Sequence, residues 1–68
     1  MTKSLRTEGR IRPHSNYTLK VFEISSNELV GKIRVWGSRV EIEAISRQVF
    51  NRIKDEIGFR WGFYCPMI

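Results

Sequence analysis

Cationic and aromatic side chains alternate with apolar residues in the middle of the sequence. Lys32, Arg34 and Trp36 stand at every second position of one segment, and Lys20 and Phe22 have the same spacing in an earlier one. In a β-strand this spacing places side chains on one face of the sheet. Aromatic rings stack on unpaired bases while Lys and Arg bind the phosphates. The spacing therefore indicates a surface for single-stranded nucleic acid.

Residues 1–16 are basic and show no hydrophobic periodicity. The segment contains four cationic residues, Lys3, Arg6, Arg10 and Arg12. Glu8 is its single acidic residue. Such a segment is typical of a solvated, mobile chain terminus. We predict a flexible basic arm over 1–16, with arginines that contact phosphates. The alternative is a tail that only increases solubility.

Residues with catalytic chemistry are few and lack partners. His14 is the only histidine and lies in the predicted arm, and Cys65 is the only cysteine. Glu41 and Glu43 are expected in the first turn of a predicted helix, where capping and the helix dipole account for acidic residues without catalysis. A lone cysteine forms no internal disulfide, and a structural zinc site needs about four ligands. We therefore predict no enzymatic activity, no metal and no cofactor.

The composition limits the chain to one small domain. It has 68 residues, of which 41% are hydrophobic, and a net charge of +5. This is enough for a single core, and the positive charge favours polyanionic partners without excluding proteins. No apolar run approaches the ~18 residues that cross a bilayer, and no signal-peptide core is present. We predict one cytoplasmic domain over 17–68 with no membrane contact.

A β-hairpin is expected to position the cationic and aromatic residues. The segments 17–25 and 31–37 are rich in β-branched and aromatic residues, and SSNELV between them supplies turn residues. Both segments therefore predict strands. The alternation breaks between Val21 and Phe22, which indicates either a β-bulge or burial on both faces.

The sequence after Ser38 predicts an amphipathic helix over 39–57. Ser38 and Glu41 have the spacing of a capping box. Apolar residues then recur at three- and four-residue steps, at Ile42, Ile45, Val49, Ile53 and Ile57. We expect the middle of this stripe to form the helix side of the core. The competing interpretation is that the second strand continues through VEIEA at 40–44, which also alternates.

Residues 59–66 predict a closing strand. Aromatic residues alternate at its start, and Pro66 ends it. The predicted fold is α+β, with a β-hairpin, one amphipathic helix and a closing strand (ββαβ). The helix would cover one face of a three-stranded antiparallel sheet of strand order 2-1-3, because the last strand is expected to lie beside the first.

The face of this sheet away from the helix is the predicted binding surface. Alternation assigns Ile33 and Val35 to the helix side and Trp36 to the open side. In the closing strand, the core side is assigned to Phe59, Trp61 and Phe63. The predicted nucleic-acid-binding residues of the arm and the open side are Arg6, Arg10, Arg12, Lys20, Lys32, Arg34, Trp36, Arg60 and Tyr64.

Two short segments resemble motifs of the PilZ cyclic-dinucleotide-binding family. RTEGR at 6–10 has that family's two spaced arginines, and EISSNE at 23–28 is loosely similar to its second motif. Glu23 and Glu28 stand where the family has Asp or Asn and Gly, and the chain is too short for the family's barrel. We therefore assign no family.

Two functions compete on this evidence. The first is a small basic nucleic-acid-binding protein that holds a single strand on the sheet or inserts the sheet into a duplex groove. The second is a protein-interaction module, such as a regulator, inhibitor or subunit. It would dock the same face or an edge strand on a larger protein or on a second copy.

Overall fold

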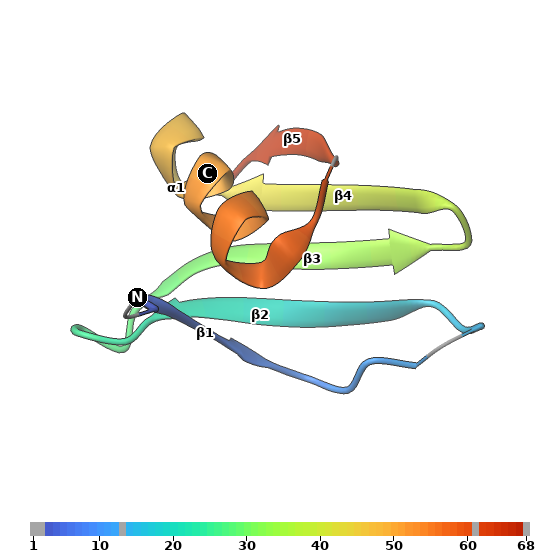
Figure 1. Cartoon of the computed structure of the whole chain (residues 1–68), viewed down its shortest axis with the longest axis horizontal. Coiled ribbons are helices and arrows are strands. Elements are labelled where there is room, and N and C mark those ends of the chain that lie inside the picture. The colour runs from blue at the N-terminus through green and yellow to red at the C-terminus, as the bar shows by residue number, and fades with distance from the viewer. Residues whose placement is uncertain (1–2, 13, 61, 68) are drawn as a thin grey trace.

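A mixed sheet with a helix packed on one face makes up the described part of the computed structural model, residues 3–12, 14–60 and 62–67. Its five strands lie in the order β1-β2-β3-β4-β5 (Figure 1). The elements are β1 (Leu5–Glu8), β2 (Tyr17–Glu23), β3 (Leu29–Trp36), β4 (Arg39–Ala44), α1 (Arg47–Ile53), the π-helix η1 (Lys54–Gly58) and β5 (Phe63–Pro66). The predicted α+β class is confirmed.

The predicted hairpin is present as β2 and β3. The two strands pair antiparallel, and their register shifts between Val21 and Phe22. This is the place where the broken alternation indicated a bulge. Val21 lies opposite Gly31 and Phe22 opposite Leu29, so the additional residue is Val30 on the partner strand.

The predicted start of the helix is wrong, because residues 39–44 form β4. Trp36 pairs directly with Arg39, which leaves Gly37 and Ser38 as a two-residue hairpin loop. Gly37 has a φ of 56°, in the left-handed region that such loops require. Ser38 is therefore a turn residue and not a helix cap. The competing interpretation, a strand through VEIEA, is the correct one.

The helix α1 is short and starts eight residues later than predicted, at Arg47 instead of position 39. Ser46 is its cap, since the Ser46 hydroxyl accepts a hydrogen bond from the Val49 N–H at 3.3 Å. Val49 and Ile53 are buried, as the apolar stripe predicted. Ile45 precedes the helix and is 54% exposed, so its predicted place in the core is wrong.

The closing strand β5 lies beside β4 and parallel to it, not beside the first strand of the hairpin. The predicted order 2-1-3 is wrong because β1 and β4 already pair with the outer edges of the hairpin. A parallel neighbour needs a crossover connection, and α1 with η1 supplies it. Trp61, which was assigned to the core, lies outside the described residues.

Part of the predicted flexible arm belongs to the sheet. Leu5 is buried in the core, and β1 pairs antiparallel with β2. The N–H groups of Ser4 and Leu5 donate to one carboxylate oxygen of Glu56 at 2.7 and 3.0 Å, and the Ser4 hydroxyl donates to the other at 2.6 Å. These bonds fix the start of β1 to η1. The residues at 9–16 then connect β1 to β2.

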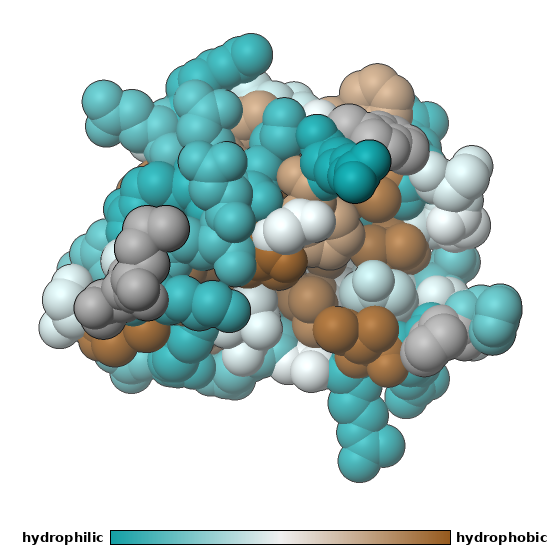
Figure 2. Space-filling view, in the orientation of Figure 1, coloured by the Kyte–Doolittle hydropathy of each residue, from teal (hydrophilic) through white to brown (hydrophobic). Residues whose placement is uncertain are grey.

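The core lies between the sheet and the helix. Its buried residues are Leu5, Leu19, Val21, Val30, Ile33, Ile42, Ala44, Val49, Phe50 and Ile53. The helix covers only one end of the sheet (Figure 1), and hydrophobic side chains show at the surface over the rest of this side (Figure 2). No helix in the described ranges is long and apolar enough to span a membrane.

Candidate nucleic-acid interface

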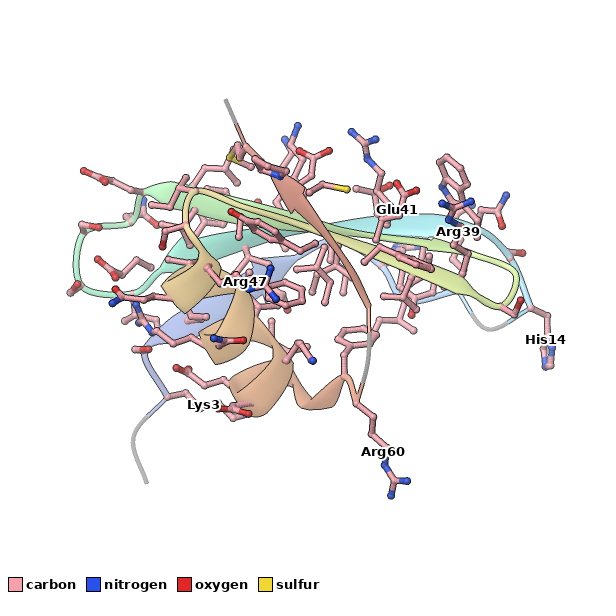
Figure 3. The ribbon with its side chains drawn as sticks, turned by 90° about the horizontal axis from the view of Figure 1, so that it is seen from above. Lys3, His14, Arg39, Glu41, Arg47 and Arg60 are labelled. Atoms are coloured by element: carbon pink, nitrogen blue, oxygen red, sulfur yellow. The ribbon has the colours of Figure 1, made fainter. Side chains whose placement is uncertain are left out.

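The sheet has no helix on its second face. Figure 3 shows Arg39 and Glu41 on this face and Arg47 on the helix side. The strand registers place the following residues there: Arg6, Glu8, Thr18, Lys20, Phe22, Lys32, Arg34, Trp36, Arg39, Glu41, Glu43, Phe63 and Cys65. We call this surface the open face. It is the surface that the sequence predicted as the binding site, although it is built from five strands instead of three.

Three arginines of the open face are bound to carboxylates. The ion pairs are Arg34 to Glu43 at 2.9 Å, Arg39 to Glu41 at 3.4 Å and Arg6 to Glu8 at 2.8 Å. All three connect side chains that share the face. Their charges are largely balanced, so these arginines are weaker phosphate ligands than free cations would be. The ion pairs also hold the guanidinium groups in place on the sheet.

Two lysines of the open face carry unbalanced charge. Lys20 lies directly opposite Lys32 on neighbouring strands. Like charges in this position repel each other. Their acidic neighbours, Glu8 and Glu43, are engaged by arginines. Neither lysine makes an ion pair within the part of the chain that the structure describes, so an anion placed between them would relieve the repulsion.

Exposed rings flank an arginine at the other end of the open face. Trp36 is 48% exposed and Phe63 is 53% exposed. Arg39 lies opposite Trp36, and its guanidinium carbon is 5.0 Å from the centroid of the Phe63 ring. We call these three residues the aromatic cluster. The predicted exposure of Trp36 on the side away from the helix is confirmed.

The predicted sides of the closing strand are reversed. Tyr64 lies opposite Ile42 of the core, and its ring centroid is 5.1 Å from that of Phe50 on the helix. Phe63, which was assigned to the core, is on the open face. The parallel pairing with β4 determines which residues of β5 face the core, and the alternation of aromatic residues alone does not. Tyr64 is therefore removed from the candidate interface.

Three further predicted residues lie away from the open face. Arg60 follows η1 and extends from the helix side of the molecule (Figure 3). Arg10 and Arg12 are exposed in the connection at 9–16, and Arg12 lines a hollow on the helix side. The structure thus unites Arg6, Lys20, Lys32, Arg34 and Trp36 of the predicted set on one surface.

Sequence reasoning missed two members of the aromatic cluster, Arg39 and Phe63. Arg39 was assigned to the helix, although Gly37 and Ser38 form a dipeptide that is typical of two-residue hairpin loops. That signal, combined with the alternation in VEIEA, would have placed Arg39 on a strand opposite Trp36. Phe63 had no comparable signal.

The three carboxylates that share ion pairs on the open face are Glu8, Glu41 and Glu43. Across residues 3–12, 14–60 and 62–67, no three His, Cys, Asp or Glu side chains lie together as metal ligands. Cys65 is a free, partly buried thiol. No family model matches the chain, and no curated protein or solved structure matches it either.

Proposed function

We propose that this protein binds single-stranded nucleic acid on its open face. The observation that carries the proposal is the aromatic cluster, because its exposed rings share a sheet surface with two lysines that make no ion pair to any described residue. Bases stack on exposed aromatic rings, which contributes ~1–3 kcal/mol per base without regard to sequence. Lys20 and Lys32 supply the charge that holds the phosphates.

The spacing of these groups suggests how a strand would lie. Lys32 and Trp36 are four residues apart on β3, which corresponds to ~13 Å at the usual rise of a β-strand. A nucleic acid strand that runs along β3 would place bases on the aromatic cluster and backbone phosphates over the lysines. The Arg39 guanidinium, held against the Phe63 ring and paired with Glu41, adds a flat surface between the rings on which a base can stack.

Titration with a single-stranded oligonucleotide at low salt tests the proposal. We expect tryptophan emission to be quenched, and Trp36→Ala to lose ~1–3 kcal/mol of affinity. Trp36→Phe identifies the quenched residue, since the chain has a second tryptophan, Trp61. Arg60→Gln removes one positive charge from the opposite side of the molecule (Figure 3) and is the control for a single Lys→Gln change on the open face.

Salt dependence separates the contributions of rings and cations. Replacing Lys20 and Lys32 by Gln removes up to two phosphate contacts and should flatten the dependence of affinity on salt. Trp36→Ala should leave that slope unchanged. Absence of binding to both single-stranded and duplex nucleic acid at low salt would refute the proposal.

The carboxylates of the open face favour a second candidate, docking on another protein. Glu8, Glu41 and Glu43 would repel a polyanion, whereas exposed Trp36 and Phe63 surrounded by mixed charges are common in protein interfaces. The partner would be a larger protein or a second copy of the chain. Light scattering tests the second copy directly, and a salt-insensitive dimer that protects Trp36 from a soluble quencher would favour this candidate.

A further inference from the structure

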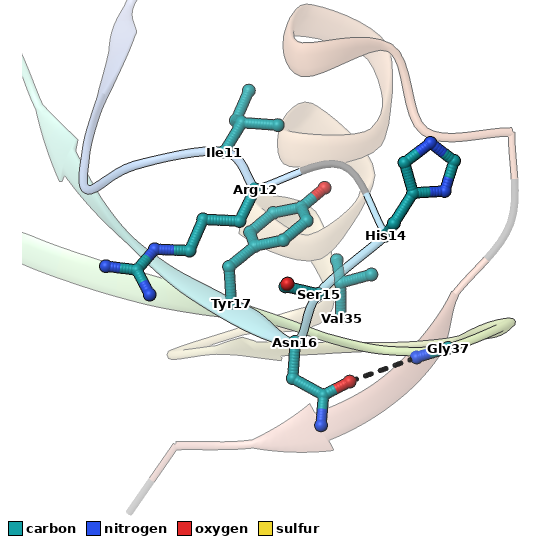
Figure 4. A pocket seen from close by; sticks show the side chains of 8 residues that line it. All are labelled: Ile11, Arg12, His14, Ser15, Asn16, Tyr17, Val35 and Gly37. Atoms are coloured by element: carbon teal, nitrogen blue, oxygen red, sulfur yellow. Dashed lines mark hydrogen bonds between the residues drawn. The ribbon is translucent and has the colours of Figure 1, made fainter.

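A hollow opens on the helix side of the sheet, at the end that the helix leaves uncovered. Its volume is about 520 Å³, within the range of ~300–1,000 Å³ typical of small-molecule sites. The residues that line it come from the 9–16 connection, the start of β2, the end of β3 and the β3–β4 loop, as Figure 4 shows: Ile11, Arg12, His14, Ser15, Asn16, Tyr17, Val35 and Gly37.

Two hydrogen bonds shape the wall of this hollow. The Ser15 N–H donates to the Arg12 carbonyl at 3.0 Å. The Asn16 side-chain oxygen accepts the Gly37 N–H at 3.3 Å and ties the connection to the β3–β4 loop (Figure 4). His14 has a φ of 68°, a conformation that residues other than glycine rarely adopt. The wall is thus anchored at both ends.

The floor of the hollow is apolar and includes a flat ring. Tyr17 and Val35 lie opposite each other on β2 and β3 and pack against the core while remaining partly exposed. Ile11 contributes a further apolar side chain that is 66% exposed. An aromatic ligand could therefore bury its ring against Tyr17 and Val35.

The rim of the hollow carries a cationic side chain and no acidic one. Arg12 forms no ion pair with any described residue, so its guanidinium is available to an anion. The Ser15 hydroxyl adds a neutral donor. In Figure 4 Arg12 and His14 extend to opposite sides of the Tyr17 ring, so an anionic group on one side of a bound ring would meet Arg12.

We propose that this hollow binds a small anion that carries an aromatic ring, with the ring on Tyr17 and the anionic group at Arg12. A nucleoside monophosphate and an aromatic carboxylate share this chemistry. The site lies on the side of the sheet opposite the open face. It is therefore independent of the proposed function.

The test uses adenosine monophosphate and benzoate as probes of the isotopically labelled protein by NMR. Adenosine and inorganic phosphate each carry half of the required chemistry. A probe with both ring and charge should shift the amide signals of the hollow's residues and bind at least about tenfold more tightly than either half. Response to adenosine monophosphate alone assigns the site to nucleotides, and response to benzoate alone assigns it to aromatic acids.

Variants connect the signal to the hollow. Arg12→Gln should weaken probe binding about tenfold or more, because it removes a charged hydrogen-bond donor. Arg10→Gln, in the same connection but outside the hollow, should leave binding unchanged. Lys20→Gln should likewise have no effect here while weakening oligonucleotide binding to the open face. No shift at millimolar probe, or full binding by the Arg12→Gln protein, would overturn the inference.

Discussion

Replacing Glu56 by Gln should destabilise the fold by detaching the N-terminal strand from the helix. The Glu56 carboxylate accepts hydrogen bonds from the Ser4 hydroxyl and from the N–H groups of Ser4 and Leu5, at 2.6, 2.7 and 3.0 Å. Arg52 lies 3.9 Å from the same carboxylate. These groups are only partly buried, so water replaces some of the lost contacts.

The expected magnitude follows from the number and type of these bonds. A hydrogen bond to a charged group contributes roughly 1.5–3 kcal/mol, and bonds that share an acceptor do not add fully. Glutamine keeps one acceptor oxygen but loses the charge. We therefore expect Glu56→Gln to lower the free energy of unfolding by about 1–3 kcal/mol at pH 7. Urea denaturation followed by circular dichroism measures this difference.

The same contacts predict how the effect depends on pH. Hydrogen bonds from the Ser4 side chain, then from the backbone of Ser4 and Leu5, together with the Arg52 charge, hold the pKa of Glu56 below its ordinary value of 4.5 despite partial burial. A lowered pKa in the folded state means that the stabilisation is complete above pH 4.5 and is lost as the pH falls through the folded-state pKa. The difference between parent and Glu56→Gln should therefore shrink below pH 4.5.

Glu28→Gln is the matched control for this experiment. Glu28 is exposed, and its carboxylate contacts no partner within the described chain, so the variant should stay within about 0.5 kcal/mol of the parent. If Glu56→Gln behaves like Glu28→Gln at pH 7, or if its deficit is the same at pH 3 as at pH 7, the carboxylate does not hold the strand as we infer.

Three further substitutions, two of them with a matched control, test the fold by chemical denaturation. Ser46→Ala should cost about 1 kcal/mol by removing the helix cap, whereas Ser38→Ala in the hairpin loop should cost less than half of that. Gly31→Ala should cost ~1–3 kcal/mol, because the added Cβ would lie 2.5 Å from a β4 carbonyl oxygen. Val49→Ala should lower the free energy of unfolding by ~1–3 kcal/mol. Ile45→Ala, at an exposed position, should change it by no more than about 0.5 kcal/mol. Equal costs within either matched pair, or a neutral Gly31→Ala, would contradict the described packing.

The parts of the fold that local sequence determines were predictable. The hairpin followed from two β-rich segments around turn residues, and the break between Val21 and Phe22 marked the register shift. Val49 and Ile53 lie in the helix under the predicted and the observed start, so their burial did not depend on where the helix begins. Trp36 was placed correctly because alternation within one strand is sufficient to do so.

The remaining features depend on contacts between distant segments. Ile42 fits a helical step to Ile45 and equally a strand alternation with Val40 and Ala44, and only pairing with β3 decides between them. Which of Phe63 and Tyr64 faces the core depends on the strand with which β5 pairs, and the local sequence pattern does not determine that strand. The charge on the open face was overestimated in part for the same reason, since Arg34 meets its carboxylate, Glu43, only when β3 pairs with β4.

The hydrogen bonds between Ser4 and Glu56 join groups 52 residues apart in the sequence. The meander of β2, β3 and β4 pairs neighbouring segments, and contacts between near neighbours form first because they cost little loop-closure entropy. On a ribosome, β1 would therefore wait for the helix to emerge before its start is secured. We expect amide hydrogens of β1, which lies at the edge of the sheet, to exchange earlier than those of β3 at its centre.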